Sequence, residues 1–73
     1  MELIPVESSN LDRVGYDTDT KTLRVLFKNG RTYDYTGVPA VMFGQLLAAE
    51  SVGKFLNGSI KPHYAVTEVK ADG

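Results

Sequence analysis

Apolar and polar residues alternate along two short runs in the middle of the chain, and Asn29-Gly30 separates these runs. Alternation with a period of two is typical of a β-strand with one buried face, and Asn-Gly between two such runs is a strong hairpin signal. We therefore expect a β-hairpin over residues 23–35. Its large side chains are Leu23, Val25 and Phe27 in the first run and Tyr33 and Tyr35 in the second.

The length of the turn decides which face of the hairpin the two tyrosines occupy. A two-residue turn made of Asn29-Gly30 would pair Lys28 with Arg31, and Val25 with Asp34. Like charges would then face each other, and a carboxylate would lie among apolar side chains, which are both unfavourable arrangements. The charge pattern therefore disfavours the two-residue turn.

A three-residue turn, Lys28-Asn29-Gly30 with Gly30 in the left-handed region, shifts the pairing by one residue. The pairs become Phe27–Arg31, Val25–Tyr33 and Leu23–Tyr35 on one face, with Arg24–Asp34 on the other. A shift of one residue moves every side chain of a strand to the opposite face. We favour this register, which predicts that Tyr33 and Tyr35 belong to the core face.

Three further segments have strand character. Residues 11–17 form one strand, in which Gly15 indicates a bulge or a close approach of another backbone segment. Residues 3–6 are interrupted by Pro5, which is typical of an edge strand or an extended lead-in. Residues 65–69 are suited to add a last strand. The hairpin and residues 11–17 predict a three-stranded antiparallel meander, and residues 65–69 would extend it to four strands.

The apolar segment from Pro39 to Glu50 is predicted to be the main helix, because proline suits the first helical position. The stripe that would cover the sheet consists of Met42, Phe43, Leu46 and Leu47. A second face carries small residues at every fourth position, namely Ala40, Gly44 and Ala48. A helix this apolar is usually buried on more than one side. We expect the small face to meet the second helix of the chain, with homodimerisation as the alternative.

A short second helix is expected from Val52 to Leu56. Ser51 is suited to cap its first turn, and Asn57-Gly58 is suited to end it because both residues tolerate the left-handed region. The predicted fold class is therefore α+β: a three- to four-stranded antiparallel β-meander with one main helix and one short helix packed on one face.

With 73 residues, the chain is expected to form one domain over residues 1–73, with its core between residues 3 and 69 and frayed residues 71–73. The absence of cysteine excludes disulfides and thiolate metal sites and suits a reducing cytoplasm. The net charge of −1 disfavours non-specific, electrostatically driven binding to nucleic acid. No apolar run approaches the roughly 20 residues of a membrane span, and Glu2 stands where a signal peptide carries positive charge. We expect a cytoplasmic protein without membrane contact.

Few residues suggest catalysis or metal binding. His63 is the only histidine, and general base catalysis would require it to meet a nucleophile and an orienting acid, which no spacing in the sequence brings together. Zinc or non-haem iron would need further His or Cys ligands. Ser8-Ser9-Asn10 is interpreted as a turn rather than as the site of a nucleophile. We expect neither an enzyme nor a bound metal or cofactor.

An ordered set of motifs from Pro5 to about Tyr64 resembles the KTSC domain. The set consists of Pro5-Val6, Ser8-Ser9-Asn10, Val14-Gly15-Tyr16-Asp17, Leu23-x-Val25-x-Phe27, Gly30, Tyr33-x-Tyr35, Val38-Pro39 and Ser51-x-Gly53. That family takes its name from the C-terminal extension of some lysyl-tRNA synthetases, and it also occurs as small stand-alone bacterial and phage-associated proteins. The resemblance implies no assigned catalytic activity. It suggests RNA binding only through the association with a tRNA synthetase.

The first functional hypothesis is an RNA-binding or translation-associated module. Such modules stack unpaired bases on aromatic side chains and place Arg or Lys near the phosphates. The residues that would form the site are Tyr33, Tyr35, Tyr16, Arg24, Lys28, Arg31, Lys54, Lys61 and His63. The opposing interpretation is that the tyrosines pack beneath the helix, and the hairpin register favours it.

The second hypothesis is a protein-interaction or oligomerisation module that uses the charge-poor main helix through Ala40, Gly44 and Ala48. The expected partner is therefore RNA, such as tRNA, or another protein. We expect a monomer or a weak homodimer. An enzyme has the least support.

Overall fold

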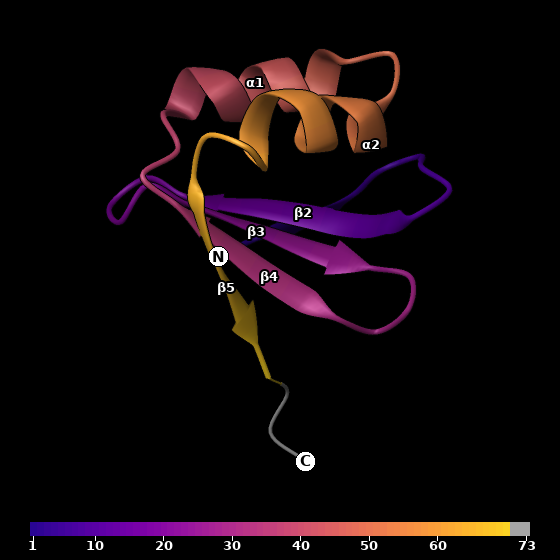
Figure 1. Ribbon diagram of the computed structural model, residues 1–73, viewed down its shortest axis with the longest axis horizontal. Helices are drawn as coiled ribbons and strands as arrows, with labels where there is room; N and C mark the ends of the chain where they lie inside the picture. Colours follow the sequence, from indigo (N-terminus) through magenta and orange to yellow (C-terminus); the bar gives the residue numbers. More distant parts are fainter. Residues whose placement is uncertain (71–73) are drawn as a thin grey trace.

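In the computed structural model, which describes residues 1–70, one antiparallel sheet carries all helical segments on one of its faces (Figure 1). The strands are β1 (Leu3–Pro5), β2 (Leu11–Asp17), β3 (Thr22–Phe27), β4 (Thr32–Thr36) and β5 (Ala65–Val69), and they lie side by side in chain order. The helices are α1 (Ala40–Ala48), α2 (Val52–Phe55) and the π-helix η1 (Leu56–Ile60). The predicted α+β class is confirmed, with five strands instead of three to four. Residues 71–73, for which fraying was predicted, lie outside the described residues.

The β3–β4 hairpin has the predicted three-residue turn. Val25 pairs with Tyr33, and Leu23 pairs with Tyr35. The amide of Phe27 donates to the carbonyl of Arg31 at 2.8 Å, and the amide of Gly30 donates to the carbonyl of Phe27 at 3.0 Å. Gly30 has φ +91°, a conformation that costs glycine little because it has no Cβ. The register that avoids facing like charges is therefore the one that forms.

The bulge in β2 lies between Leu11 and Arg13 instead of at Gly15. The extra residue in this strand brings both Leu11 and Val14 to the core, although they are three positions apart. Gly15 shows the other feature predicted for it, a close backbone approach. A Cβ built on Gly15 would lie 2.7 Å from the carbonyl oxygen of Glu2 and 2.8 Å from the Cδ2 atom of Leu3.

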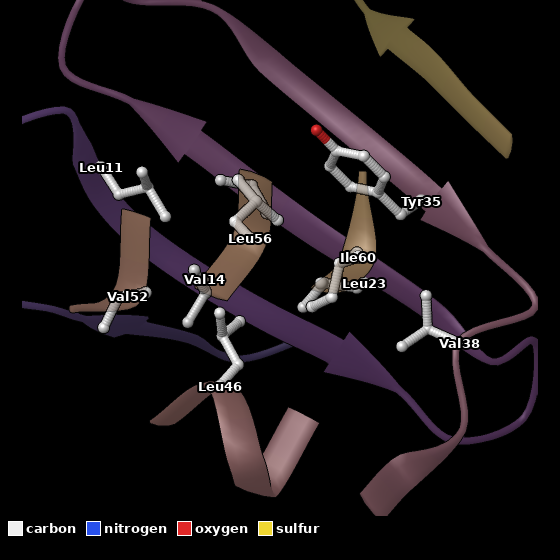
Figure 2. Close-up of a cluster of buried hydrophobic side chains, with 10 residues drawn as sticks. Leu11, Val14, Leu23, Tyr35, Val38, Leu46, Val52, Leu56 and Ile60 are labelled. Carbon is white, nitrogen blue, oxygen red and sulfur yellow. The ribbon is translucent and has the colours of Figure 1, made fainter. Parts of the chain in front are cut away.

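The core lies between the sheet and the helices (Figure 2). In β3 and β4 the core residues are the side chains that alternation placed on one face. Of the α1 stripe that was predicted to cover the sheet, Leu46 is fully buried, whereas the prediction is wrong for Leu47, which is 40% exposed. A fully buried leucine or isoleucine stabilises the fold by about 1.5–3 kcal/mol relative to an exposed one. The buried residues are Leu11, Val14, Leu23, Val25, Tyr35, Val38, Leu46, Val52, Leu56 and Ile60.

Pro39 occupies the N-cap position of α1, so the helix begins one residue later than predicted. The amide of Met42 donates to the carbonyl of Pro39 at 2.9 Å. Tyr16 fixes this helix to the sheet, because its ring stacks on Phe43 and its hydroxyl donates to the carbonyl of Val38. Tyr16 is therefore a structural contact between β2 and the start of α1.

The second helical segment begins as predicted and ends later than predicted. The Ser51 hydroxyl accepts a hydrogen bond from the amide of Lys54 at 3.3 Å, which confirms the predicted cap. The predicted end at Asn57-Gly58 is wrong, because these residues lie inside η1. The backbone continues in a wide turn, with the amide of Lys61 donating to the carbonyl of Leu56 at 2.8 Å. This turn buries Leu56 and Ile60, and their burial explains why the helical path continues.

The expectation that the small-residue face of α1 meets the second helix is also wrong. Ala40, Gly44 and Ala48 are exposed, and a Cβ built on Gly44 would meet nothing within 4 Å. The reason is that the second helical segment must place its own apolar residues on the sheet. It therefore lies in the same layer as α1, and it does not cover the outer surface of that helix (Figure 1).

Candidate functional site

A notch of about 320 Å³ opens between the β3–β4 hairpin and η1. Phe27, Tyr33 and Tyr35 supply aromatic wall, and Val66 of β5 adds an aliphatic contact. The rings of Phe27 and Tyr33 meet edge to face, with centroids 5.5 Å apart and planes at 85°. Two rings at this angle form a corner in which a flat molecule can stack on one ring while its edge meets the other.

Tyr35 contributes little open surface to the notch because the residue is only 3% exposed. Burial, followed by the nearby charge of Tyr33, raises the pKa of Tyr35 above its ordinary value. Tyr33 is half-buried, so its ring is shared between the core and the notch. The tyrosine pair predicted from the hairpin therefore has two roles, with Tyr35 in the core and Tyr33 at its rim.

The polar part of the notch comes from Asn29, Asn57 and Lys61, which are all exposed. The side-chain oxygen of Asn29 accepts a hydrogen bond from the amide of Arg31 at 2.9 Å. Asn57 lies in η1 and Lys61, four positions later, is its C-cap residue, so each directly follows one of the buried residues Leu56 and Ile60. The same turn that buries Leu56 and Ile60 therefore carries two polar side chains of the notch.

Two cations of the predicted set lie at the β3–β4 turn, Lys28 as its first residue and Arg31 directly after its last. Lys28 and Arg31 are exposed, and the amide of Lys28 donates to the carbonyl of Asn10 at 2.8 Å, which holds the turn against the chain before β2. Hydrogen bonding to Tyr33, followed by the charges of Tyr33 and Glu68, raises the pKa of the Arg31 guanidinium. Arg31 therefore lies beside the aromatic corner as a permanent positive charge.

Lys54 and His63 are exposed, and in the sequence they lie before and after the notch residues Asn57 and Lys61. Lys54 is in α2, three positions before Asn57, and His63 is in the turn that follows η1. The amide of His63 donates to the carbonyl of Ile60 at 3.0 Å. Lys54 therefore precedes η1 and His63 follows it, and neither side chain lines the notch.

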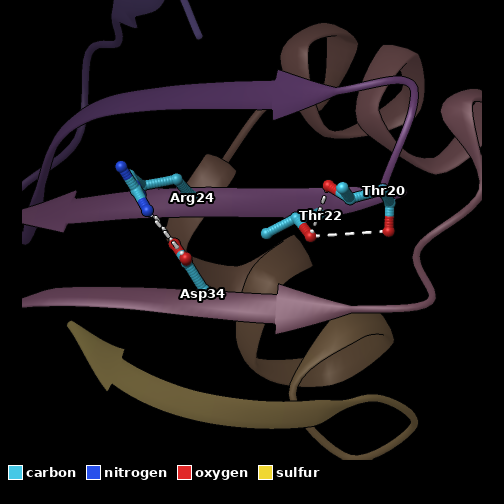
Figure 3. A network of polar contacts seen from close by, with 4 residues as sticks. All are labelled: Thr20, Thr22, Arg24 and Asp34. Atoms are coloured by element: carbon cyan, nitrogen blue, oxygen red, sulfur yellow. Dashed lines mark hydrogen bonds and ion pairs between the residues drawn. The ribbon is translucent and has the colours of Figure 1, made fainter.

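The structure does not bring Arg24 to the notch. Arg24 lies on the helix-free face of the sheet, where its Nε and Nη2 atoms donate to Oδ1 and Oδ2 of Asp34, both at 2.8 Å (Figure 3). The side chains are 35% and 17% exposed, respectively. Hydrogen bonding to Asp34 raises the pKa of Arg24. The guanidinium is thus occupied by the pair that the register predicted, and Arg24 stabilises the sheet.

Tyr16 is also separate from the notch, because its ring stacks on Phe43 with centroids 5.3 Å apart. Of the predicted residues, the notch itself brings together Tyr33, Tyr35 and Lys61. Phe27, Asn29 and Asn57 were not predicted as site residues. Asn57 was assigned to a helix end, and only its spacing of four from Lys61 could have indicated a shared surface.

A second hollow, of about 480 Å³, lies between β1 and the α1–α2 connection. Leu47 borders it, and so do the carboxylates Glu7 and Glu50. The adjoining outer surface of α1 is apolar, with Val41 64% exposed and Leu47 40% exposed. The two hollows therefore differ in charge, because one carries a lysine and the other carries two acids.

Ser8-Ser9-Asn10 and the connection that begins at Asp17 both serve as turns. The Ser8 hydroxyl accepts from the amides of Asn10 and Leu11 at 3.3 and 3.2 Å, as the turn interpretation predicts. Asp17 accepts from the amide of Asp19 at 2.9 Å. Within residues 1–70, no group of three or more His, Cys, Asp or Glu side chains is arranged to hold a metal ion. In the same part of the chain, no helix has the length and apolarity needed to cross a membrane.

Comparisons with known proteins agree with this architecture. The profile of the KTSC domain family matches residues 7–64. A protein from Tsukamurella paurometabola is 48% identical over 60 residues, which cover 82% of this chain and 90% of the relative. An uncharacterised protein from Stutzerimonas stutzeri is 38% identical over 65 residues, which cover 88% and 92%. The crystal structure of a KTSC domain protein from Yersinia pestis superposes with a TM-score of 0.88 at 34% identity, covering 94% of this chain and 97% of that one. The chain therefore belongs to the KTSC domain family.

Proposed function

We propose that this KTSC domain binds single-stranded RNA at the notch between the β3–β4 hairpin and η1, and that it acts by binding instead of by catalysis. The observation that carries the proposal is the meeting of Tyr33 and Lys61, from distant parts of the chain, in one notch with Phe27. Single-stranded RNA is commonly held by aromatic side chains that contact bases and by cations that contact the backbone.

The charge distribution supports this location for the RNA. Lys61 is at the notch, and Lys28 and Arg31 border the adjacent turn, whereas the second hollow has Glu7 and Glu50 at its border. A polyanion is repelled by carboxylates and attracted to lysine and arginine. The association of the family with some lysyl-tRNA synthetases points the same way.

The net charge of −1 sets the expected strength of binding. Long-range attraction is weak, so affinity must come from contacts at the notch and from a few phosphates. With two to four phosphate contacts, the logarithm of the association constant should fall against the logarithm of salt concentration with a slope of roughly −1.5 to −3. A much steeper slope would indicate a larger basic surface than the described residues provide.

The test is a titration of the labelled protein with tRNA and with short single-stranded RNA at low and moderate salt. Binding is expected for both, with the largest NMR shifts at the notch. Arg31→Gln should weaken binding and reduce the salt slope by about 0.7, the contribution of one phosphate contact on a single strand. Tyr33→Ala should weaken binding by roughly 1–3 kcal/mol, the range for loss of one stacked base.

The matched control is Arg13→Gln, which makes the same charge change on another exposed arginine. Arg13 is on β2, where its Nε atom lies 3.9 Å from Oδ2 of Asp12. Equal losses for Arg31→Gln and Arg13→Gln would show that only net charge matters. Absence of binding at either salt concentration would refute the RNA proposal.

Self-association through α1 is a second candidate function. It is favoured by the exposure of Val41 and Leu47 on a helix that carries no charged residue. Apolar side chains exposed on an uncharged helix are available for contact with a second copy of the chain. Sedimentation velocity over a range of concentrations tests it: Val41→Lys should abolish a dimer if α1 forms the interface, and a concentration-independent monomer would exclude it.

A further inference from the structure

Both Asn-Gly dipeptides of the sequence lie at the notch. Asn29 and Asn57 line it, and each is followed by a glycine, whereas the third asparagine, Asn10, is followed by Leu11. An asparagine before glycine is prone to deamidation, because glycine has no side chain to hinder attack of its own backbone nitrogen on the asparagine side chain. Two polar groups of the notch are therefore open to the same chemical change.

Deamidation needs no reactant other than water. The backbone nitrogen of the glycine, after giving its proton to a solvent base, forms a bond to Cγ of the asparagine. The bond from Cγ to Nδ2 breaks, and the leaving nitrogen takes up a proton and departs as ammonia, so that a cyclic succinimide remains. Water then opens the ring. Cleavage of the newly formed bond gives aspartate, and cleavage of the original peptide bond gives isoaspartate.

The conformation of the β3–β4 turn favours this reaction at Asn29. The side-chain oxygen of Asn29 accepts from the amide of Arg31 at 2.9 Å, and this bond folds the side chain back over the peptide that joins Asn29 to Gly30. The same bond polarises the carbonyl that is attacked. The amide of Gly30 donates to the carbonyl of Phe27 at 3.0 Å, and this bond must open first. It lies in an exposed turn, where local opening costs little.

Asn57 has the same following residue and a different backbone. It lies in η1, where side chains tilt toward the helix N-terminus and so away from the nitrogen of the following residue. Leu56 and Ile60 anchor η1 in the core with exposures of 1% and 0%, so the ring can close only after η1 opens. Asn10 is protected differently, because the side chain of Leu11 hinders the attack. The structure therefore separates Asn29 from the other two asparagines.

We propose that the Asn29-Gly30 turn is a deamidation site whose conversion places a carboxylate in the notch and weakens RNA binding there. The loss of affinity rests on the proposed function, and the site of the reaction does not. A carboxylate at position 29 lies between the exposed cations Lys28 and Arg31 in sequence and shares the notch with Lys61, where a phosphate is expected. One exposed charge should lower the affinity for RNA about 2- to 5-fold at low salt, and by less at moderate salt.

The first experiment follows deamidation of the full chain by mass spectrometry during incubation at mildly alkaline pH. Chymotrypsin cuts after Phe27 and Tyr33 and releases residues 28–33, in which Asn29 is the only asparagine. This peptide should gain the mass difference between water and ammonia, and it should separate into aspartyl and isoaspartyl forms. In the folded chain, Asn29 should react at least about 10-fold faster than Asn57, which waits for η1 to open. In urea the two rates should become similar, because both dipeptides are then unfolded.

A matched variant tests whether the reaction depends on this one side chain. Asn29→Gln should abolish the mass gain of residues 28–33, because glutamine would have to close a larger ring. Asn57→Gln should leave that gain unchanged. Absence of conversion at Asn29, or conversion of Asn57 at the same rate in the folded chain, would overturn the assignment of the site.

The second experiment measures the affinity for single-stranded RNA. Asn29→Asp makes the same charge change without isoaspartate, and Gln45→Glu makes it on the exposed surface of α1 as a control. Asn29→Asp should weaken RNA binding, and Gln45→Glu should leave it unchanged. Equal effects of the two variants would overturn the control of RNA binding by this site. If the unmodified chain binds no RNA, the proposed function and its control both fail, whereas the mass spectra still support or refute the reaction at Asn29.

Discussion

The pair formed by Arg24 and Asp34 joins the two central strands of the hairpin across the helix-free face, and its removal has a calculable cost. Two unit charges 2.8 Å apart attract by about 1.5 kcal/mol in water and by several times that at an effective dielectric constant of 20. With the side chains 35% and 17% exposed, desolvation and side-chain entropy offset much of this attraction. We expect a coupling free energy of about 1–1.5 kcal/mol, which is larger than that of exposed ion pairs and smaller than that of fully buried ones.

A double-mutant cycle measures this coupling. The free energy of unfolding in urea is determined for the wild type, Arg24→Met, Asp34→Asn and the double variant. The interaction energy is the deviation of the double variant from the sum of the single changes. At 1 M salt the Debye length is about 3 Å, so the coupling should fall, although direct contact at 2.8 Å should preserve part of it.

The chain contains a matched control pair. Asp12 and Arg13 make a single contact at 3.9 Å, with side chains 55% and 54% exposed, and they should couple by less than about 0.5 kcal/mol. A coupling for Arg24 and Asp34 no larger than that of the control would refute the reasoning. A second outcome follows from the proposed function: Arg24→Met should lower stability and leave RNA affinity unchanged.

Three further changes test other parts of the fold. Gly15→Ala places a Cβ 2.7 Å from the carbonyl oxygen of Glu2, so it should lower the free energy of unfolding in urea by about 1–3 kcal/mol. It should also remove the hydrogen-exchange protection of the β1 amides, and full protection of these amides would contradict the clash. Gly30→Ala should cost roughly 1–2 kcal/mol because φ is +91°, whereas Gly58→Ala, inside η1 with open space, should cost nothing. Tyr35→Phe should flatten the decline of the free energy of unfolding at alkaline pH. Because the pKa of Tyr35 is raised in the folded state, the stability that its neutral hydroxyl contributes is complete below the unfolded-state pKa of about 10. This stability is lost as the pH rises through the pKa of the folded state. Tyr64→Phe is the control. If Tyr35→Phe leaves the alkaline decline of the unfolding free energy unchanged, Tyr35 is not its source.

The hairpin was predictable because its register depends on local facts that the sequence displays. The pairing of Arg24 with Asp34 and the avoidance of Lys28 facing Arg31 selected one of two turns, and the structure has that turn. β2 was placed with its observed bounds for the same reason, since strand alternation is local. The bulge between Leu11 and Arg13 was not predicted, because it depends on which residues the helices bury.

Tertiary packing decides where the second helix ends and whether the small-residue face of α1 is buried, so the local sequence did not predict either. Asn57-Gly58 is a good local stop signal, but burial of Leu56 and Ile60 outweighs it. The notch was missed as a unit because its residues come from β3, β4, η1 and β5, and only folding brings these together. Tyr33 and Lys61 were nevertheless in the predicted set, since aromatic and basic residues are recognisable one by one.

The chain-order arrangement of β1 to β5 has a consequence for the speed of folding. Each strand pairs with the strand before or after it in the chain, and the β2–β3 and β3–β4 pairs are joined by short turns. Little loop entropy is lost in closing such pairs, and the rate of folding falls as contacts become more distant in sequence. The one long closure in the sheet of the described residues is that of β4 with β5, because α1, α2 and η1 lie between these strands in the chain. Folding should therefore start at β2–β3–β4, and docking of β5 should be late, with φ-values near zero for substitutions at Val66.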